Sequence, residues 1–259
     1  KIMKKLIITL ITCFIMMTGY AQLINMRYLK VDRGMETKFK EGAKKKTSIY
    51  NSKEGQIRYF TFLVNTGPHS GEYFRVRYEE ELSGFDSNDP KGNAYWNDLV
   101  GDLHTSSDAQ RWGYVKNASH VTVSPFAKPL RRVLTYNYKG TMEKEFWRFR
   151  NNVAQALQNA DADIFMEVWW CGSGCNGNTV NVVFGHKNYA EQATDNSEEW
   201  VKVVEKYNEM FGEDAYEEDI QAFETSLEMY GRSSHSMSFQ PEMSSPENMS
   251  SLEELNTNN

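Results

Sequence analysis

The sequence is poor in cysteine, proline and positive charge. Its 259 residues include three cysteines and six prolines, and 29 Lys and Arg stand against 35 Asp and Glu, a net charge of -6. Nucleic-acid binding needs a concentrated basic surface, so this balance argues against a nucleic-acid partner. The chain also has no His-x-x-x-His, no Gly-x-Ser-x-Gly and no glycine-rich phosphate loop. The short motifs that identify common metal, hydrolase and phosphate sites are therefore absent.

Long apolar runs are missing except near the N-terminus. Two lysines precede an almost wholly apolar stretch from Leu6 to Met17, and Ala21 follows as a small residue for cleavage. This order is typical of a signal peptide, and the run is short for a membrane span. We expect residues 1–22 to be removed on export to the periplasm or the extracellular space, leaving a soluble protein with no membrane span. Retention as an anchor and acylation at Cys13 are the alternatives.

Cleavage leaves two cysteines, Cys171 and Cys175, on either side of a three-residue glycine-containing turn. Exported proteins mature in an oxidising compartment, and this turn can bring two thiols within bonding reach. We predict a disulfide that clips the turn. Reduced or redox-active thiols and metal binding are the alternatives, but two thiolates underfill a zinc site and no histidine lies close in sequence. No metal site is predicted.

A strand–helix–hairpin pattern occurs twice, 107 positions apart and without a gap. The hydrophobic fraction of 40% and the aromatic fraction of 13% are enough for a packed core. Matching positions pair Met35 with Met142, Phe39 with Phe146, Ile57 with Ile164, Phe62 with Trp169 and Gly67 with Gly174. This self-similarity indicates an internal duplication.

The first unit is predicted to span residues 23–124. Alternating and two-sided apolar runs predict strands, and apolar residues at helical spacing predict helices. The expected strands are 27–31, 57–64, 72–78 and 119–123, and the expected helices are 35–50 and 96–103, with a polar loop at 83–92.

The second unit is predicted to span residues 131–240, after a linker at 125–130 that contains two prolines. A disordered tail is expected at 241–259 because Ser, Glu, Asn and Met dominate there. The expected strands are 133–138, 164–170, 179–184 and 234–239, and the expected helices are 142–157, 200–211 and 220–227.

Each unit therefore has the order β-α-β-β-α-β, which is that of a ferredoxin-like unit. Helices would cover one face of each sheet, and the two-sided apolar strands that begin at Ile57 and Ile164 indicate that the other face is buried too. The predicted fold class is α+β, with two tandem ferredoxin-like units packed sheet to sheet around an internal pseudo-twofold axis. We expect a monomer.

This layout resembles the dimeric α+β barrel superfamily, in a single-chain form with both halves fused. The resemblance covers about residues 27–239 and rests on element order and repeat spacing. Some members of that superfamily are monooxygenases, some degrade haem, and many have no known activity. The resemblance leaves haem open as a cofactor, but no motif in the sequence supports it, and fold analogy alone does not select an activity.

Glu167 is the main candidate for chemistry. It lies in an apolar strand in register with Phe165 and Trp169. A buried, isolated carboxylate has a raised pKa and is suited to proton transfer. A structural ion pair, for example with Arg148, and a position at the rim are the alternatives. The candidate ligand-binding residues are Glu167, Trp169, Asn137, Asn181 and His186.

Three functions remain open from the sequence. The first is an exported protein that binds a small apolar or aromatic molecule in a pocket of the second unit, where the aromatic excess can either fill the core or line a cavity. The second is a monooxygenase-like or isomerase-like enzyme that uses Glu167 or a histidine as base. His120 and His235 come into question because they follow serines at matching places in the two units. The third is a structural envelope protein without a ligand.

Overall fold

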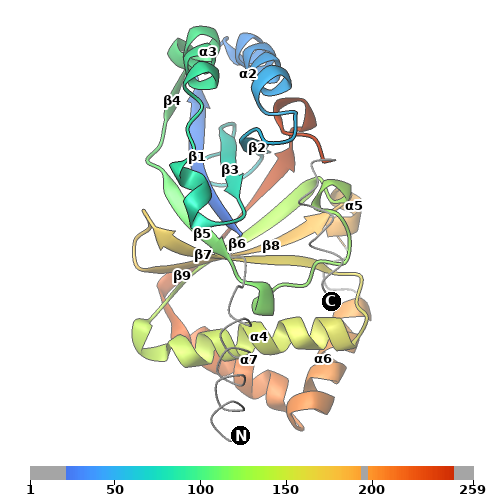
Figure 1. Cartoon of the computed structure of the whole chain (residues 1–259). Coiled ribbons are helices and arrows are strands. Elements are labelled where there is room, and N and C mark those ends of the chain that lie inside the picture. The colour runs from blue at the N-terminus through green and yellow to red at the C-terminus, as the bar shows by residue number, and fades with distance from the viewer. Residues whose placement is uncertain (1–21, 194–197, 248–259) are drawn as a thin grey trace, which may run out of the picture.

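The computed structural model describes residues 22–193 and 198–247 (Figure 1). The predicted signal peptide, apart from Gln22, lies outside this part of the chain. Within it, no helix has the length and apolar character needed to cross a membrane. The strands are β1 Leu23–Val31, β2 Arg58–Val64, β3 Tyr73–Glu79, β4 His104–Ser106, β5 Gln110–Tyr114, β6 Leu130–Tyr138, β7 Phe165–Ser173, β8 Asn178–His186 and β9 Leu227–Phe239. The α-helices are α2 Glu36–Tyr50, α3 Pro90–Val100, α4 Glu143–Asn159, α5 Tyr189–Gln192, α6 Glu198–Phe211 and α7 Ala215–Ser226.

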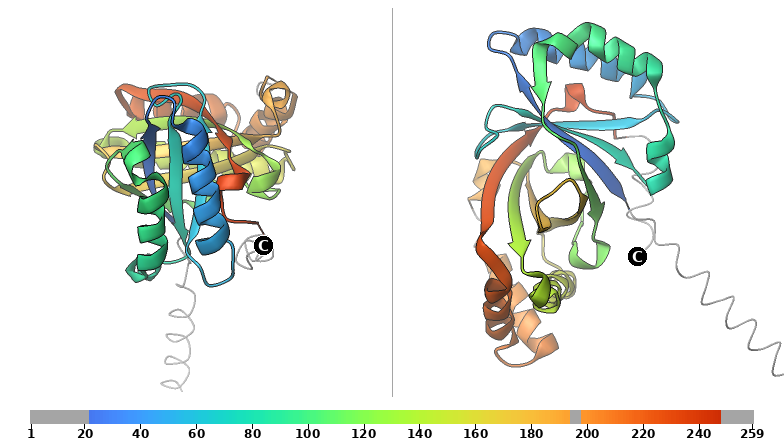
Figure 2. Two further views of the ribbon diagram at one scale, coloured as in Figure 1. Left: turned by 90° about the horizontal axis from the view of Figure 1, so that it is seen from above. Right: turned by 90° about the vertical axis from the view of Figure 1, so that its left-hand side faces the viewer.

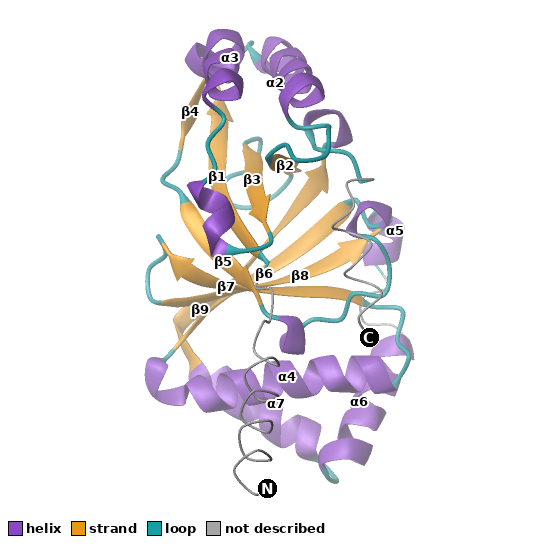
Figure 3. Ribbon diagram, in the orientation of Figure 1, coloured by secondary structure: helices purple, strands orange, loops and turns teal. Residues whose placement is uncertain are grey.

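Eight of these strands form a closed antiparallel barrel. Their order is β3-β2-β9-β6-β8-β7-β5-β1, and pairing of β1 with β3 closes the ring. The short β4 pairs with the end of β1. The helices lie outside, with α2 and α3 beyond one side of the strands and α4, α6 and α7 beyond the other (Figures 1 and 3). The fold is thus a mixed α+β fold built on a closed barrel.

The two halves of the chain contribute four barrel strands each. The first half has the order β5-β1-β3-β2 and the second has the order β9-β6-β8-β7, so in each half the first strand lies between the last and the third. The halves join through β2–β9 and β5–β7 pairing. One chain therefore closes the barrel by itself, and Figure 2 shows the strands crossing between the two helical layers.

Side-chain alternation along the strands separates the barrel interior from the helical layers. On β3, Phe74 and Val76 belong to the interior cluster, whereas Tyr73 packs with α2 and α3. On β7, Met166 and Val168 pack with the outer helices α4, α6 and α7. The strands are consequently apolar on both faces, as predicted for residues 57–64 and 164–170.

Helix α4 matches the predicted apolar face. Phe146, Phe149, Val153, Ala156 and Leu157 are all at most 2% exposed, and their spacing places them on one stripe against the sheet.

Helix α3 begins earlier than predicted, at Pro90 inside the expected loop. The Asp89 carboxylate accepts a hydrogen bond from the Gly92 amide at 2.9 Å, and Pro90 at the first helical position has a backbone conformation suited to a helix start.

The predicted strand at 119–123 is wrong. The last barrel strand of the first half is β5, and a turn of 3-10 helix follows at Lys116–Ala118. The Ser119 hydroxyl donates to Val115 O at 2.8 Å and accepts from Val168 N at 2.9 Å, so this segment is tied to β7 by a side chain. The backbone of His120 forms an isolated bridge to Met166 and no regular strand pairing. His120 and His235 are thus not equivalent, because His235 lies within β9.

The described part of the predicted tail, residues 241–247, is folded. A 3-10 turn spans Pro241–Met243, and Met243 is only 3% exposed. Beyond it, the hydroxyls of Ser244 and Ser245 accept hydrogen bonds from the amides of Thr61 and Tyr59 on β2, at 2.9 and 3.0 Å. These contacts cover backbone donors of β2 beyond the end of β9. Residues 248–259 lie outside the described chain.

Candidate active site

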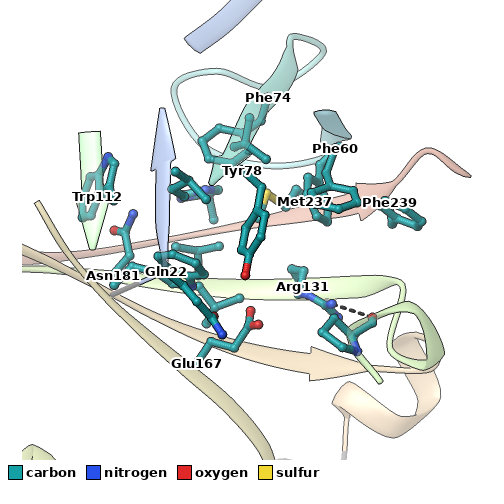
Figure 4. Close-up of a pocket in the computed structure, with 18 of the residues that line it drawn as sticks. Gln22, Phe60, Phe74, Tyr78, Trp112, Arg131, Glu167, Asn181, Met237 and Phe239 are labelled. Atoms are coloured by element: carbon teal, nitrogen blue, oxygen red, sulfur yellow. Dashed lines mark hydrogen bonds between the residues drawn. The ribbon is translucent and has the colours of Figure 1, made fainter. Parts of the chain in front are cut away.

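The barrel interior contains a cavity of about 140 Å³ (Figure 4). An apolar protein cavity of roughly 150 Å³ accommodates one benzene molecule, so this space is suited to a compact single-ring compound. Most of the lining is aliphatic or aromatic, including Ile24, Phe60, Phe62, Phe74, Val76, Trp112, Val133 and Val183.

Both halves of the chain line this cavity, which corrects the prediction of a pocket in the second unit alone. Phe60, Tyr78 and Trp112 come from the first half, and Glu167 and Met237 come from the second. The two sheets face one another across the interior, so the inward side chains of both meet in one space. The expected linker also takes part, since Pro125 and Phe126 of its 3-10 turn belong to the lining.

Three polar side chains from three strands approach one region of the cavity. Glu167 on β7 directs its carboxylate toward the hydroxyl of Tyr78 on β3, and Arg131 on β6 lies to one side of both (Figure 4). Glu167 retains partial exposure, and the surface it exposes faces the cavity. The carboxylate is thus removed from bulk solvent but accessible to a bound molecule.

Burial raises the pKa of Glu167 above the ordinary value of 4.5, against the opposing influence of the Arg131 charge and a hydrogen bond with Trp169. Burial, with the Glu167 charge as a further contribution, also raises the pKa of Tyr114 to about 12. Burial likewise raises the pKa of the Tyr78 phenol. Both hydroxyls stay protonated near neutral pH, whereas the carboxylate moves toward the range in which it is an effective proton acceptor.

Arg131 is held rigidly and is incompletely paired. The side chain is 3% exposed, and Nη2 donates to Pro125 O at 2.6 Å. Nη1 has no hydrogen-bond partner among residues 22–193 and 198–247. The guanidinium also lies over the Phe165 ring, 4.9 Å from its centroid. Gly185 makes room for this arrangement, because a Cβ there would be 2.9 Å from Nη1.

Of the five residues predicted to bind a ligand, Glu167, Trp169 and Asn181 line the cavity together. Asn137 and His186 are not part of the lining. The Asn137 Oδ1 accepts a hydrogen bond from the Thr179 hydroxyl at 2.8 Å. His186 is buried at the end of β8, opposite Leu130 on β6.

The suggested ion pair between Glu167 and Arg148 does not form. Arg148 instead pairs with Asp219 at 2.8 Å, on the outer helices. Alternation along β7 places Glu167 on the opposite face of the sheet, inside the barrel. The charge that influences it is Arg131, which stood at the boundary of the predicted linker.

Sequence reasoning also missed Tyr78, although residues 72–78 were predicted to form a strand. The missing information was which face met the second sheet. Two further polar side chains, those of Tyr28 and His235, also line the cavity. Burial lowers the pKa of His235, and the nearby His69 adds to this effect.

The predicted pairing of Cys171 with Cys175 is present, with the sulfurs 1.92 Å apart near the tip of the β7–β8 hairpin. Gly174 adopts a φ of +83°, and a Cβ there would lie 2.5 Å from Ala109 O. The sharp turn therefore requires glycine. Within the described ranges, no cluster of three or more His, Cys, Asp or Glu side chains is arranged to hold a metal ion.

Haem does not fit this cavity. A tetrapyrrole is several times larger than the single ring that a space of about 140 Å³ accommodates. His235 is the one histidine in the cavity lining.

Comparisons with known proteins locate the chain at the level of fold. No protein-family model and no curated protein matches the sequence. Among solved structures, a proposed monooxygenase of Fusobacterium nucleatum subsp. nucleatum is similar, with a TM-score of 0.57 and 11% identity over 86% of this chain and 94% of that one. A proposed monooxygenase of Lactobacillus acidophilus NCFM has a TM-score of 0.53 and 9% identity over 85% of this chain and 94% of that one. A chlorite dismutase variant of Candidatus Nitrospira defluvii in complex with cyanide has a TM-score of 0.52 and 12% identity over 86% of this chain and 92% of that one. Likeness at these identities concerns the fold, and this chain shares the dimeric α+β barrel fold with these proteins.

Proposed function

We propose that this protein is a monooxygenase-like enzyme that binds a compact aromatic molecule in the barrel cavity and uses Glu167 as general base. The observation that carries the proposal is a carboxylate of raised pKa that faces a largely aromatic cavity. Perturbed titration beside a concave apolar site is typical of catalytic groups. The fold neighbours described as monooxygenases are in keeping with this reading.

The chemistry starts with transfer of a proton from the substrate to Glu167. A suitable substrate has a C–H bond next to a carbonyl group or an activated ring, because the resulting anion is delocalised. Dioxygen is the co-reactant. A CH₂ group and O₂ together give a C=O group and water, so one oxygen atom enters the product and the other leaves as water. The Tyr78 hydroxyl, which points toward Glu167, is placed to donate a hydrogen bond to oxygen-centred charge.

The proposal includes an architecture of two fused ferredoxin-like units that act as a monomer. Support comes from the equivalent strand orders of the two halves and from Phe39 and Phe146, which are both at most 1% exposed on the first helix of their half. Size-exclusion chromatography with light scattering should give the mass of one chain. A stable dimer mass would contradict the monomer.

Export is the second part of the proposal. The apolar run from Leu6 to Met17 and the paired cysteines support it. Fractionation of the source cells should recover a chain shortened by about the length of residues 1–22 outside the cytoplasm. A full-length chain in the cytoplasmic fraction would contradict export.

The catalytic proposal is tested by deuterium exchange into phenylacetone, which has one ring and a CH₂ group next to a carbonyl. Wild-type protein should catalyse exchange in D₂O, and Glu167→Gln should lower the rate by about 10²–10⁴-fold, the usual contribution of a general base. Glu228→Gln, an exposed residue on β9, is the matched control. Exchange that persists unchanged in Glu167→Gln would refute the role of this carboxylate.

Oxygen uptake separates the remaining candidates. A monooxygenase-like enzyme consumes O₂ with a substrate of this class, whereas an isomerase-like enzyme exchanges protons without O₂ uptake. A binding protein takes up the ring without either reaction, and the largely apolar lining favours it as second candidate. Retention of an aromatic ligand by Glu167→Gln, with no turnover by wild type, would establish the binding role.

A further inference from the structure

We propose that Arg131 anchors a carboxylate group of the bound molecule, so that the ligand class is a single-ring aromatic acid. This inference deepens the proposed function and rests on the cavity being the ligand site. It names a specificity-determining residue other than Glu167, and its evidence is the geometry of the guanidinium.

The first observation is the unpaired donor. Arg131 is 3% exposed, yet Nη1 has no hydrogen-bond partner in the described parts of the chain. A buried charged donor without a partner is costly, and most buried polar groups in proteins are paired. The side chain belongs to the cavity lining, so an oxygen anion inside the cavity can complete the hydrogen bonding of Nη1 once the atoms that cover this buried nitrogen move aside.

The second observation is the fixed position of the guanidinium. Nη2 is held by Pro125 O at 2.6 Å, and the Phe165 ring packs against the flat face. The nearby Gly185 has no side chain that would displace it. A planar donor group held on one edge and one face loses little conformational entropy when a ligand carboxylate binds it.

The third observation is the contrast between this group and the rest of the cavity. Phe60, Trp112 and Val183 are among the apolar side chains that suit a ring, whereas Arg131 is the cationic group in the lining. A carboxylate on the ring therefore matches the cavity better than a second apolar group does, since a charge-assisted hydrogen bond contributes about 1.5–3 kcal/mol.

The ligand charge should also change the protonation of Glu167. The groups that face its carboxylate are Arg131 on β6, Tyr78 on β3, Tyr114 on β5 and the Trp169 side chain on its own strand. The Arg58 guanidinium on β2 lies over the Tyr78 ring, 5.4 Å from its centroid, and His235 on β9 also belongs to the cavity lining.

Arg131 is the group among these that favours the ionised form by its charge. A ligand carboxylate on Arg131 offsets that charge and adds a negative one. The pKa of Glu167 should therefore rise further when the acid binds, so that part of the carboxylate population takes up a proton and the part that stays ionised becomes a stronger base.

The probe for the anchor is benzoate, and benzamide is its neutral partner of nearly equal shape. Calorimetric titration of wild-type protein should show benzoate binding at least about tenfold more tightly than benzamide, the equivalent of about 1.4 kcal/mol. Arg131→Gln should remove this preference and leave benzamide binding within about twofold. Arg132→Gln is the matched control, because it removes the same charge from the next position on β6, which points to the opposite face.

Proton uptake gives a readout that a merely structural role of Arg131 would not produce. Titrations of wild-type protein with benzoate in buffers of different ionisation enthalpy should show proton uptake, at a pH where the free Glu167 is mainly ionised. Benzamide should show none, and Glu167→Gln should bind benzoate without uptake. These wild-type measurements test the proposal even where Arg131→Gln does not fold.

The outcomes separate the two proposals. Equal affinity of wild type for benzoate and benzamide, or an unchanged preference in folded Arg131→Gln, overturns the anchor while the cavity remains the ligand site. Binding of neither probe overturns the cavity as ligand site and the anchor with it. Preferential benzoate binding together with unaltered deuterium exchange in Glu167→Gln supports the anchor and refutes the catalytic proposal.

Discussion

The substitution Glu167→Gln should increase stability, and the gain should depend on pH. Burial raises the pKa of this carboxyl in the folded state, whereas the unfolded chain titrates near the ordinary value of 4.5. Below that value the group is protonated in both states, and the variant differs little from wild type. As pH rises, the unfolded chain ionises freely while the folded chain resists ionisation. Wild type therefore loses stability relative to the variant until the folded pKa is passed, and the difference then levels off.

The size of the effect follows from two opposing contributions in the structure. Desolvation disfavours the ionised carboxylate, and the Arg131 charge favours it without a hydrogen bond from Nη1. Desolvation prevails. The free energy of unfolding of the variant should therefore exceed that of wild type by about 1.4 kcal/mol for each tenfold by which folding weakens the acidity of Glu167. A direct buried ion pair would give the opposite sign, because breaking one costs about 3–5 kcal/mol.

The assay is urea unfolding of wild type and variant at acidic, neutral and mildly alkaline pH, with a comparison of the free energies of unfolding at each. Glu228→Gln, in an exposed position, should show no growing gain across this range. The reasoning about desolvation would be refuted if Glu167→Gln were less stable than wild type at neutral pH. It would also be refuted if the difference in free energy of unfolding between the two proteins were the same at every pH.

Three further substitutions test other parts of the structure. Replacing Cys171 and Cys175 by serine should lower the free energy of unfolding by about 2 kcal/mol, since the bond spans a sequence separation of 4; alkylation without reductant should label neither thiol in the exported wild type. Tyr207→Phe should cost about 1.5–3 kcal/mol in urea unfolding, because the hydroxyl donates to Asp219 at 2.5 Å. Gly185→Ala should cost about 1–3 kcal/mol by overpacking and should weaken benzoate binding in calorimetry, whereas unchanged values for both would contradict the close packing there.

Periodicity in the sequence was sufficient to predict helix α4 and strand β7. The apolar stripe of α4 is unambiguous because Phe146, Phe149 and Val153 recur at helical spacing. Strand β7 was equally clear, since Phe165, Glu167 and Trp169 alternate with apolar residues of the outer face. Glu167 was identified as a candidate for this reason alone.

Elements fixed by tertiary contacts could not be predicted in the same way. Residues 119–123 have a strand-like composition, but the Ser119 side chain bonds to β7 in place of a regular ladder. The Gln110–Tyr114 strand has little apolar alternation, and pairing with β1 and β7 determines it. Local preference was overridden in both segments.

The composition of the site depended on the same long-range contacts. Tyr78 and Glu167 are 89 positions apart, and nothing local to either strand indicates that they meet. Arg131 was assigned to the edge of a linker, although β6 begins at Leu130 and carries it into the interior. Only closure of the barrel by β2–β9 and β5–β7 pairing brings these three side chains to one cavity.

The most direct test of the central claim is the pH dependence of deuterium exchange into phenylacetone. The account predicts that the wild-type rate rises with pH as Glu167 ionises, with a midpoint above 4.5, and that Glu167→Gln lacks this rise. A Glu167→Gln variant that keeps both the wild-type rate and its pH profile would contradict the account.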